Sequence, residues 1–156
     1  MASTYTYRNL ILWQKAQSLG YEVVKLTRRL PQNWANAIIA RQIIASATSV
    51  AANIAEGHGR FSIGAHRNHL SIARGSAAET DSWIDLLRRD DAINSTEEQR
   101  LHGLCQELMV MFASKMRDLD ERSGGEKGKI SERNEQYVMD SSEHVPPLPF
   151  TPADYI

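Results

Sequence analysis

Cysteine is nearly absent from this sequence. The single cysteine, Cys105, cannot form a disulfide within the chain. This excludes a small scaffold that depends on disulfides and favours a reducing compartment. The first residues also lack the basic and then apolar pattern of a secretory signal. We therefore expect a cytoplasmic protein.

An excess of charge of one sign is also missing. The 156 residues include 18 Lys and Arg against 19 Asp and Glu, which gives a formal net charge of −1. As a bulk figure, this charge gives no support to nucleic-acid binding. However, residues 1–60 contain seven basic and two acidic residues, whereas residues 123–156 contain three basic and six acidic residues. The chain thus has a basic first half and an acidic C-terminal segment.

No apolar run predicts a transmembrane helix. The most apolar stretch, residues 37–55, is rich in alanine and is interrupted by polar residues such as Arg41 and Asn53. A helix that spans a membrane needs about 20 predominantly apolar residues. We expect a buried helix of a globular protein here, and no contact with a membrane.

Proline is rare until the end of the chain. Pro31 is the only proline before residue 146, and the other four lie between residues 146 and 152. The stretch Ser-Gly-Gly-Glu-Lys-Gly-Lys from Ser123 has the composition of a flexible linker. We predict one folded domain over residues 1–122, followed over residues 123–156 by a linker and an extended, proline-containing tail.

The pattern of apolar residues predicts helices in residues 1–122. Three stripes repeat at intervals of three and four residues, which is the spacing of one helix face. Pro31 is expected to end the first helix, and short connections favour antiparallel neighbours. The predicted fold is all-α, an antiparallel up-down four-helix bundle. The stripes are Leu12, Ala16, Leu19, Val23, Leu26 and Leu30; Leu70, Ala73, Ala77, Thr80, Ile84 and Leu87; and Leu101, Cys105, Leu108, Phe112, Met116 and Leu119.

The second helix is expected to begin after Asn33, its N-cap, and to end near Gly57. Arg41 is the only charged residue between positions 35 and 55, so this helix lacks a polar face. A helix that is apolar nearly all round is buried on more than one side. Three other helices cannot easily cover every side of it, so we predict self-association. Gly57 and Gly59 would end the helix through the left-handed conformation that glycine adopts at low cost.

Capping residues indicate where the third and fourth helices begin. Ser62 is the expected N-cap of the third helix. Ser95 and Glu98 have the spacing of a capping box, in which each side chain bonds to the backbone of the other residue. We therefore predict that this pair opens the fourth helix.

The turn between the second and third helices has the sequence Asn53-Ile-Ala-Glu-Gly-His-Gly-Arg60. Glu56 would lie in the last turn of a helix, where the helix macrodipole disfavours an acidic residue. Arg60 is the nearest residue that could offset this cost. We predict an ion pair between these two residues.

Folding this hairpin about residue 60 sets the second helix against the third. Arg41 would face Glu79, and residues 45–47 would face the stretch that contains Arg74 and Gly75. Small residues on both sides would let the two backbones approach closely. We interpret these polar residues as structural ion pairs and caps, because buried charges are normally paired for stability.

No motif predicts an enzyme, a metal site or a cofactor site. His66 and His69 are three residues apart, but no further ligand completes a metal-binding set. The sequence contains no nucleophile elbow, phosphate loop or dinucleotide fingerprint. Cys105 belongs to a core stripe and is interpreted as a small apolar residue. The enzymatic alternative is a hydrolase or nuclease site formed by Glu56, Arg60 and Arg74.

Most basic residues of the first half lie on or beside the first helix. A basic stripe along one helix is typical of a surface that binds nucleic-acid phosphates. The alternative is a solvated outer face that keeps an oligomer in solution. Self-association would repeat the stripe around a ring, which favours the binding interpretation. The residues are Arg8, Lys15, Lys25, Arg28 and Arg29.

The stretches Leu10–Ala16, Ser49–Arg60 and His69–Glu79, together with Gln42, carry a family resemblance. Over about residues 7–120, the chain resembles the four-helix-bundle family named after proteins encoded in 23S ribosomal RNA intervening sequences. This family includes the Avd-like accessory proteins of diversity-generating retroelements. The resemblance implies an antiparallel four-helix protomer and a ring-shaped homopentamer. For the Avd-like branch, it implies a partnership with a reverse transcriptase and its template RNA.

The sequence departs from the family pattern in two places. Relatives usually have basic residues directly after the glutamine that Gln42 matches, whereas this chain has Ile44 and Ala45 there. The first helix would then make the contacts with RNA. The tail after Ser123 is also longer than the pattern requires.

The resulting hypothesis is a non-enzymatic homo-oligomer that binds RNA and a protein partner, as an accessory subunit of a retroelement reverse transcriptase. We predict neither a cofactor nor a metal ion. The alternative is a purely structural or protein-interaction bundle with no role in nucleic-acid binding.

Overall fold

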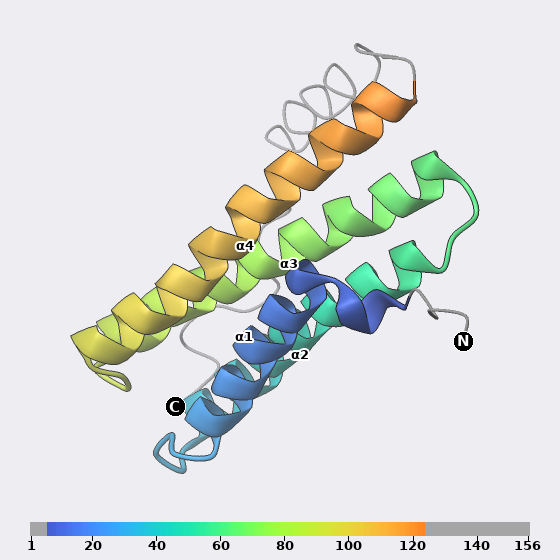
Figure 1. The fold of residues 1–156 in the computed structure, drawn as a ribbon. Helices are drawn as coiled ribbons and strands as arrows, with labels where there is room; N and C mark the ends of the chain where they lie inside the picture. The colour runs from blue at the N-terminus through green and yellow to red at the C-terminus, as the bar shows by residue number, and fades with distance from the viewer. Residues whose placement is uncertain (1–5, 124–156) are drawn as a thin grey trace, which may run out of the picture.

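The computed structural model describes residues 6–123. Consecutive α-helices run antiparallel, and the last returns to pack against the first, so each one contacts two neighbouring α-helices (Figure 1). The predicted all-α up-down bundle is confirmed. The predicted extended tail lies outside the described residues. The elements are η1 (Tyr7–Asn9), α1 (Ile11–Thr27), α2 (Trp34–His58), α3 (Ile63–Arg89) and α4 (Ser95–Arg122).

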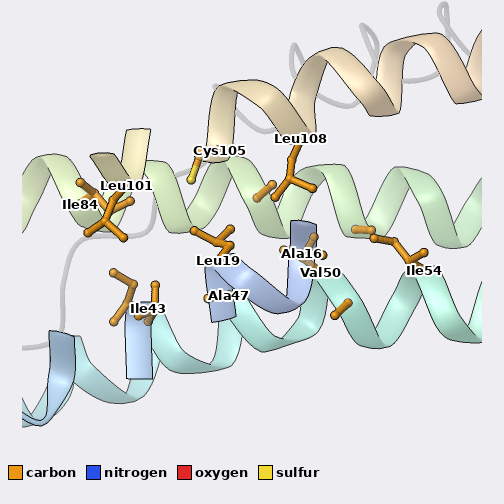
Figure 2. Close-up of a cluster of buried hydrophobic side chains, with 14 of the residues drawn as sticks. Ala16, Leu19, Ile43, Ala47, Val50, Ile54, Ile84, Leu101, Cys105 and Leu108 are labelled. Atoms are coloured by element: carbon orange, nitrogen blue, oxygen red, sulfur yellow. The ribbon is translucent and has the colours of Figure 1, made fainter. Parts of the chain in front are cut away.

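The core is built from the predicted stripes. Every member of the α1 and α3 stripes is buried, and in the α4 stripe only Met116 is half-buried. α2 adds Ile43, Ala47, Val50 and Ile54 from the opposite side (Figure 2). Full burial of one such aliphatic side chain stabilises a fold by about 1.5–3 kcal/mol relative to exposure. These interlocking stripes therefore provide most of the energy that holds the helices together.

Cys105 lies inside this core, as predicted (Figure 2). Burial raises the pKa of its thiol to about 12, and a hydrogen bond and the negative charge of Asp81 act in the same direction. The thiol therefore stays protonated at neutral pH and is a poor nucleophile.

Two of the predicted N-caps are present. The Asn33 side chain accepts a hydrogen bond from the Asn36 backbone N–H at 2.8 Å, and α2 begins at the next residue. The Ser62 hydroxyl accepts from the Ala65 N–H at 3.2 Å at the start of α3. Each cap satisfies one of the backbone donors that a helix start leaves free.

The predicted cap of α4 is wrong by one residue. Asn94 Oδ1 accepts from the Glu97 N–H at 2.9 Å, and a Glu97 carboxylate oxygen accepts from the Asn94 N–H at 3.3 Å. Asparagine is as good a helix cap as serine, and α4 has Asn94 as its N-cap in place of Ser95. The shift leaves Glu98 free to contact Arg88 of α3 and His102 of its own helix.

Two helix ends also differ from the expectation. α1 ends at Thr27, well before Pro31, although Leu30 is still buried. At the end of α2, Gly57 lies within the helix, and the C-cap Gly59 has a φ of −79°. The predicted left-handed glycine stop is therefore wrong. Among the described non-glycine residues, Asp91 between α3 and α4 has the left-handed backbone, with a φ of 52°.

By length and composition, α2 is long and apolar enough to cross a membrane. This differs from the sequence expectation, which gave more weight to the polar residues that interrupt the apolar run. Core helices of water-soluble bundles have the same length and composition. In this fold, Ile43, Val50 and Ile54 of α2 are buried in the bundle core.

Candidate functional site

A chain of hydrogen bonds crosses the seam between α2 and α3 beside their turn. Arg60 forms an ion pair with Glu56 and donates from Nε to His69 Nε2 at 3.2 Å. The other ring nitrogen, Nδ1, lies 3.2 Å from Asn53 Oδ1. The Asn53 amide in turn donates to the carbonyl oxygen and the hydroxyl of Ser49 at 2.9 and 3.0 Å. Both ring nitrogens of His69 therefore have a hydrogen-bond partner.

The chain continues along the seam through small hydroxyl residues. The Ser76 hydroxyl donates to the Ser49 hydroxyl at 3.0 Å. One helical turn further on, Ser46 Oγ and Thr80 Oγ1 lie 2.9 Å apart, and both side chains are buried. Because buried polar groups need partners, these contacts hold α2 and α3 in one register.

This register differs from the predicted one. For each hydrogen-bonded pair that joins α2 to α3, the average of the two residue numbers lies between 61 and 63, whereas the prediction placed it at 60. Arg41 therefore makes no ion pair with Glu79, and the predicted opposition is wrong. Glu79 accepts instead from Trp83 Nε1 at 3.3 Å. The offset grows with distance from the turn, since the midpoint moves from residue 61 for Asn53 and His69 to residue 63 for Ser46 and Thr80.

The close approach between the two backbones occurs at a different glycine from the predicted one. A Cβ atom at Gly57 would lie 2.9 Å from His69 Cβ and 3.2 Å from the backbone oxygen of His66. A Cβ atom at Gly75 would meet no atom within 4 Å. Gly75 and Arg74 are exposed on α3. Gly57 is therefore the residue whose missing side chain lets α3 pack against α2.

The enzymatic alternative finds no support in this geometry. Glu56 and Arg60 bond to each other and to the seam. Arg74 makes no hydrogen bond or ion pair with either residue in the described part of the chain. The three side chains thus form no common site.

Two residues of the predicted basic stripe are engaged with α4. Lys15 Nζ lies 2.7 Å from Glu107 Oε1, and Arg29 Nη2 lies 2.7 Å from Glu97 Oε1. Both pairs join residues far apart in the sequence, so neither was visible in the pattern of charges. Two of the five residues predicted to bind RNA therefore already face carboxylates.

Glu22 adds a third link between α1 and α4. It pairs with Arg100 of α4 and, at 3.2 Å, with Lys25 of its own helix. The hydrogen bond from Arg100, supported by Lys25, lowers the pKa of Glu22 despite partial burial. Lys25 is thus the third member of the predicted stripe in an ion pair.

Arg8 and Arg28 complete the predicted stripe. The Arg8 guanidinium lies 4.9 Å from the centre of the Tyr7 ring. Arg28 is exposed at the C-cap of α1 and has no ion pair in the described part of the chain. The five residues therefore do not form a surface of five free cations.

Other arginines are exposed and free of ion pairs within residues 6–123. Sequence reasoning missed them as a group, because free and paired cations look alike without the fold. Three of them lie on the α2–α3 hairpin. The set is Arg41, Arg74, Arg89, Arg117 and Arg122.

One face of α2 is left uncovered. α2 packs against η1, α1 and α3 but does not contact α4. On its open side, Trp34 is 83% exposed and Ile38 is 44% exposed, and Ala45 and Ala52 follow at intervals of seven residues. An exposed apolar patch of this kind is typical of a protein–protein contact.

The α3–α4 seam contains a cluster that the sequence analysis did not predict. His102 Nδ1 lies 2.5 Å from Asp81 Oδ1, and Nε2 lies 3.1 Å from Asp85 Oδ1 and 3.9 Å from Glu98 Oε1. Burial disfavours the charged ring, but bonds to Asp81 and Asp85 outweigh it and raise the pKa of His102. The only sequence signal is a spacing of four residues within each pair, on two helices that the fold brings together.

His66, one of the histidines considered for a metal site, lies elsewhere. It lines a pocket of 340 Å³ at one end of the bundle, together with Leu70, Met111 and Lys115. Burial, with a smaller effect from the charge of Lys115, lowers the pKa of His66. The lowered pKa favours the neutral form of the ring.

Taken together, these features define a helical bundle with polar seams and one uncovered apolar helix face. The chain belongs to the 23S rRNA-intervening sequence protein family, whose model matches residues 8–114. No catalytic activity is known for this family.

A solved relative has the same fold. It is a protein of unknown function from the S23 ribosomal protein family of Bacteroides thetaiotaomicron VPI-5482. The two sequences are 26% identical, and the TM-score is 0.65. The match covers 68% of this chain and 98% of the relative. No curated protein is similar enough to count as a match.

Proposed function

We propose that this protein is a non-catalytic homo-oligomer whose assembled form binds RNA. The observation that carries the proposal is the uncovered face of α2, with exposed Trp34, Ile38, Ala45 and Ala52. Burying these side chains in a contact between copies would remove apolar surface from water. The family resemblance implies five copies in a ring.

Assembly would also multiply the exposed arginines. Arg28 is exposed at the C-cap of α1 and Arg74 is exposed on α3, so neither lies on the uncovered face of α2. A single copy offers few free cations, whereas a ring repeats each one around its surface. Affinity for phosphates increases with the number of neutralised charges, because each contact releases condensed counterions.

A matched pair of variants tests the role of these arginines. Arg28→Glu and Lys25→Glu make the same change of charge at the end of α1, but only Lys25 is already paired with an acid. In a salt titration with single-stranded RNA, we expect tight binding at low salt and a steep loss with added salt. Arg28→Glu should weaken binding more than Lys25→Glu. Equal effects of the two reversals would contradict the role given to Arg28.

A second pair tests whether assembly is needed. Ala45→Glu places a charge on the uncovered face of α2, whereas Ala113→Glu makes the same change on exposed α4 surface. We expect Ala45→Glu to weaken both self-association and RNA binding, and Ala113→Glu to leave both unchanged.

The second candidate is a protein-interaction bundle without a role in RNA binding. It is favoured by the ion pairs of Lys15, Lys25 and Arg29, which reduce the positive charge of the predicted stripe. An RNA affinity that is weak and indifferent to salt would support it. A reverse transcriptase as the protein partner stays a prediction from the family resemblance.

A further inference from the structure

Four side chains on the α3–α4 seam have the chemistry of metal ligands. Asp81 and Asp85 lie four residues apart on α3, and Glu98 and His102 lie four residues apart on α4. Residues at this spacing share one helix face. Since α3 and α4 are antiparallel neighbours, the two pairs face each other. We call these four residues the His102 cluster.

Three atoms of the cluster converge on one point. His102 Nε2 lies 3.1 Å from Asp85 Oδ1 and 3.9 Å from Glu98 Oε1. One ligand atom from each residue lies within 4.8 Å of the others. Zinc binds nitrogen and oxygen at about 2.0–2.2 Å, so two ligands of a tetrahedral ion are about 3.3 Å apart. Small side-chain rotations would bring the three atoms to these distances.

Asp81 holds the imidazole in the orientation that this arrangement needs. Its Oδ1 lies 2.5 Å from His102 Nδ1, on the side of the ring away from Asp85 and Glu98. Asp81 can keep a proton on Nδ1, so a metal ion would have to displace only the proton that Nε2 shares with Asp85. Histidines that bind metal ions commonly donate their other N–H to a carboxylate in this way.

The charges of the cluster also favour a cation. Three carboxylates surround one imidazole, and the nearest guanidinium, that of Arg88, is shared with Asp91 at 2.9 Å. Arg88 approaches Glu98 at the other carboxylate oxygen, with Nε 3.4 Å from Oε2. Glu98 Oε1 is therefore available to the cluster. A divalent cation would neutralise charge that the described side chains leave unbalanced.

We propose that Asp85, Glu98 and His102 bind a divalent transition-metal ion, for which zinc is the best match, and that Asp81 is a positioning residue. The imidazole selects against magnesium and calcium, which prefer ligands that are all oxygen. Three protein ligands leave at least one position for water. The bound ion would link α3 to α4 at the edge of the bundle, since all three ligands are partly accessible to solvent.

The test is a titration of the full chain, stripped of metal with a chelator, with zinc or cobalt(II) salts. We expect one ion per chain, a rise in Tm on addition of zinc, and visible absorption bands of cobalt bound to protein. No uptake of either ion up to about 1 mM, the weak end of specific metal affinities, would overturn the proposal.

Variants locate the site. His102→Asn and Asp85→Asn each remove a ligand with little change in size, and each should weaken binding by about tenfold or more. Asp81→Asn should weaken it by about tenfold through the orientation of His102. Glu121→Gln is the control, because Glu121 is exposed on α4 and outside the cluster. Circular dichroism checks that each variant is folded.

The same variants show whether zinc binds at the His102 cluster or at other histidines. If zinc binds equally well to His102→Asn and to the parent, the ion lies elsewhere and the proposal is wrong. If cobalt bands and the Tm shift both disappear in His102→Asn and Asp85→Asn but persist in Glu121→Gln, the site is the His102 cluster.

Discussion

Two glycine-to-alanine substitutions should have opposite effects on the stability of the bundle. Both positions lie inside helices, where alanine is favoured over glycine by about 0.8–1 kcal/mol. Gly75 faces open space, so Gly75→Ala should gain most of this amount. Gly57 lies against α3, so Gly57→Ala must also displace its neighbours.

The cost at Gly57 follows from the distances. A new Cβ atom would lie 2.9 Å from His69 Cβ and 3.2 Å from the backbone oxygen of His66. Neither neighbour is the end of a flexible side chain, so α3 must shift as a whole. Inserting a methyl group into a packed site typically costs about 1–3 kcal/mol. After the gain in helix propensity, we expect a net loss of about 0–2 kcal/mol for Gly57→Ala.

Urea denaturation followed by circular dichroism measures both variants at one chain concentration, because self-association makes stability depend on concentration. We expect the midpoint of Gly75→Ala to rise and that of Gly57→Ala to lie clearly below it. A Gly57→Ala variant as stable as Gly75→Ala would show that the α2–α3 seam is not packed as described.

Three further predictions concern caps and ion pairs. Asn94→Ala should cost about 1 kcal/mol in an unfolding experiment, whereas Ser95→Ala should be nearly neutral, because Asn94 is the cap of α4. Arg60→Ala should cost at most about 1 kcal/mol in the same assay, since Arg60 and Glu56 are each about half exposed. The lowered pKa of Glu22 means that its stabilising effect is present above its usual pKa of 4.5 and is lost as the pH falls through the lower folded value. In thermal melts at decreasing pH, the Tm of the parent should therefore fall more than the Tm of Glu22→Gln.

The periodicity of apolar residues was sufficient to predict the buried faces of α1, α3 and α4. A helix stripe is a local property, so residues such as Leu19, Ala77 and Leu108 could be placed in the core from spacing alone. The cap of α4 was misplaced because Asn94 and Ser95 are both good capping residues with an acid three positions later. Local sequence does not decide between two such neighbours.

Features that depend on two helices at once were predicted less well. The register of α2 against α3 depends on how the two helices pack along their length, so a shift of a few residues separated Arg41 from Glu79. The cations of α1 looked free because their partners, such as Glu107, lie on α4. The His102 cluster could not be found for the same reason, since its two halves are unremarkable pairs until α3 and α4 are set side by side.

Assembly through the uncovered face of α2 is the central claim, and the mass of the protein in dilute solution tests it most directly. Light scattering of the full chain should give a multiple of the 17.5 kDa protomer mass, five times that value if the family resemblance holds. The Ala45→Glu variant should give a smaller mass, and Ala113→Glu the same mass as the parent. A mass of 17.5 kDa for the parent would contradict the account.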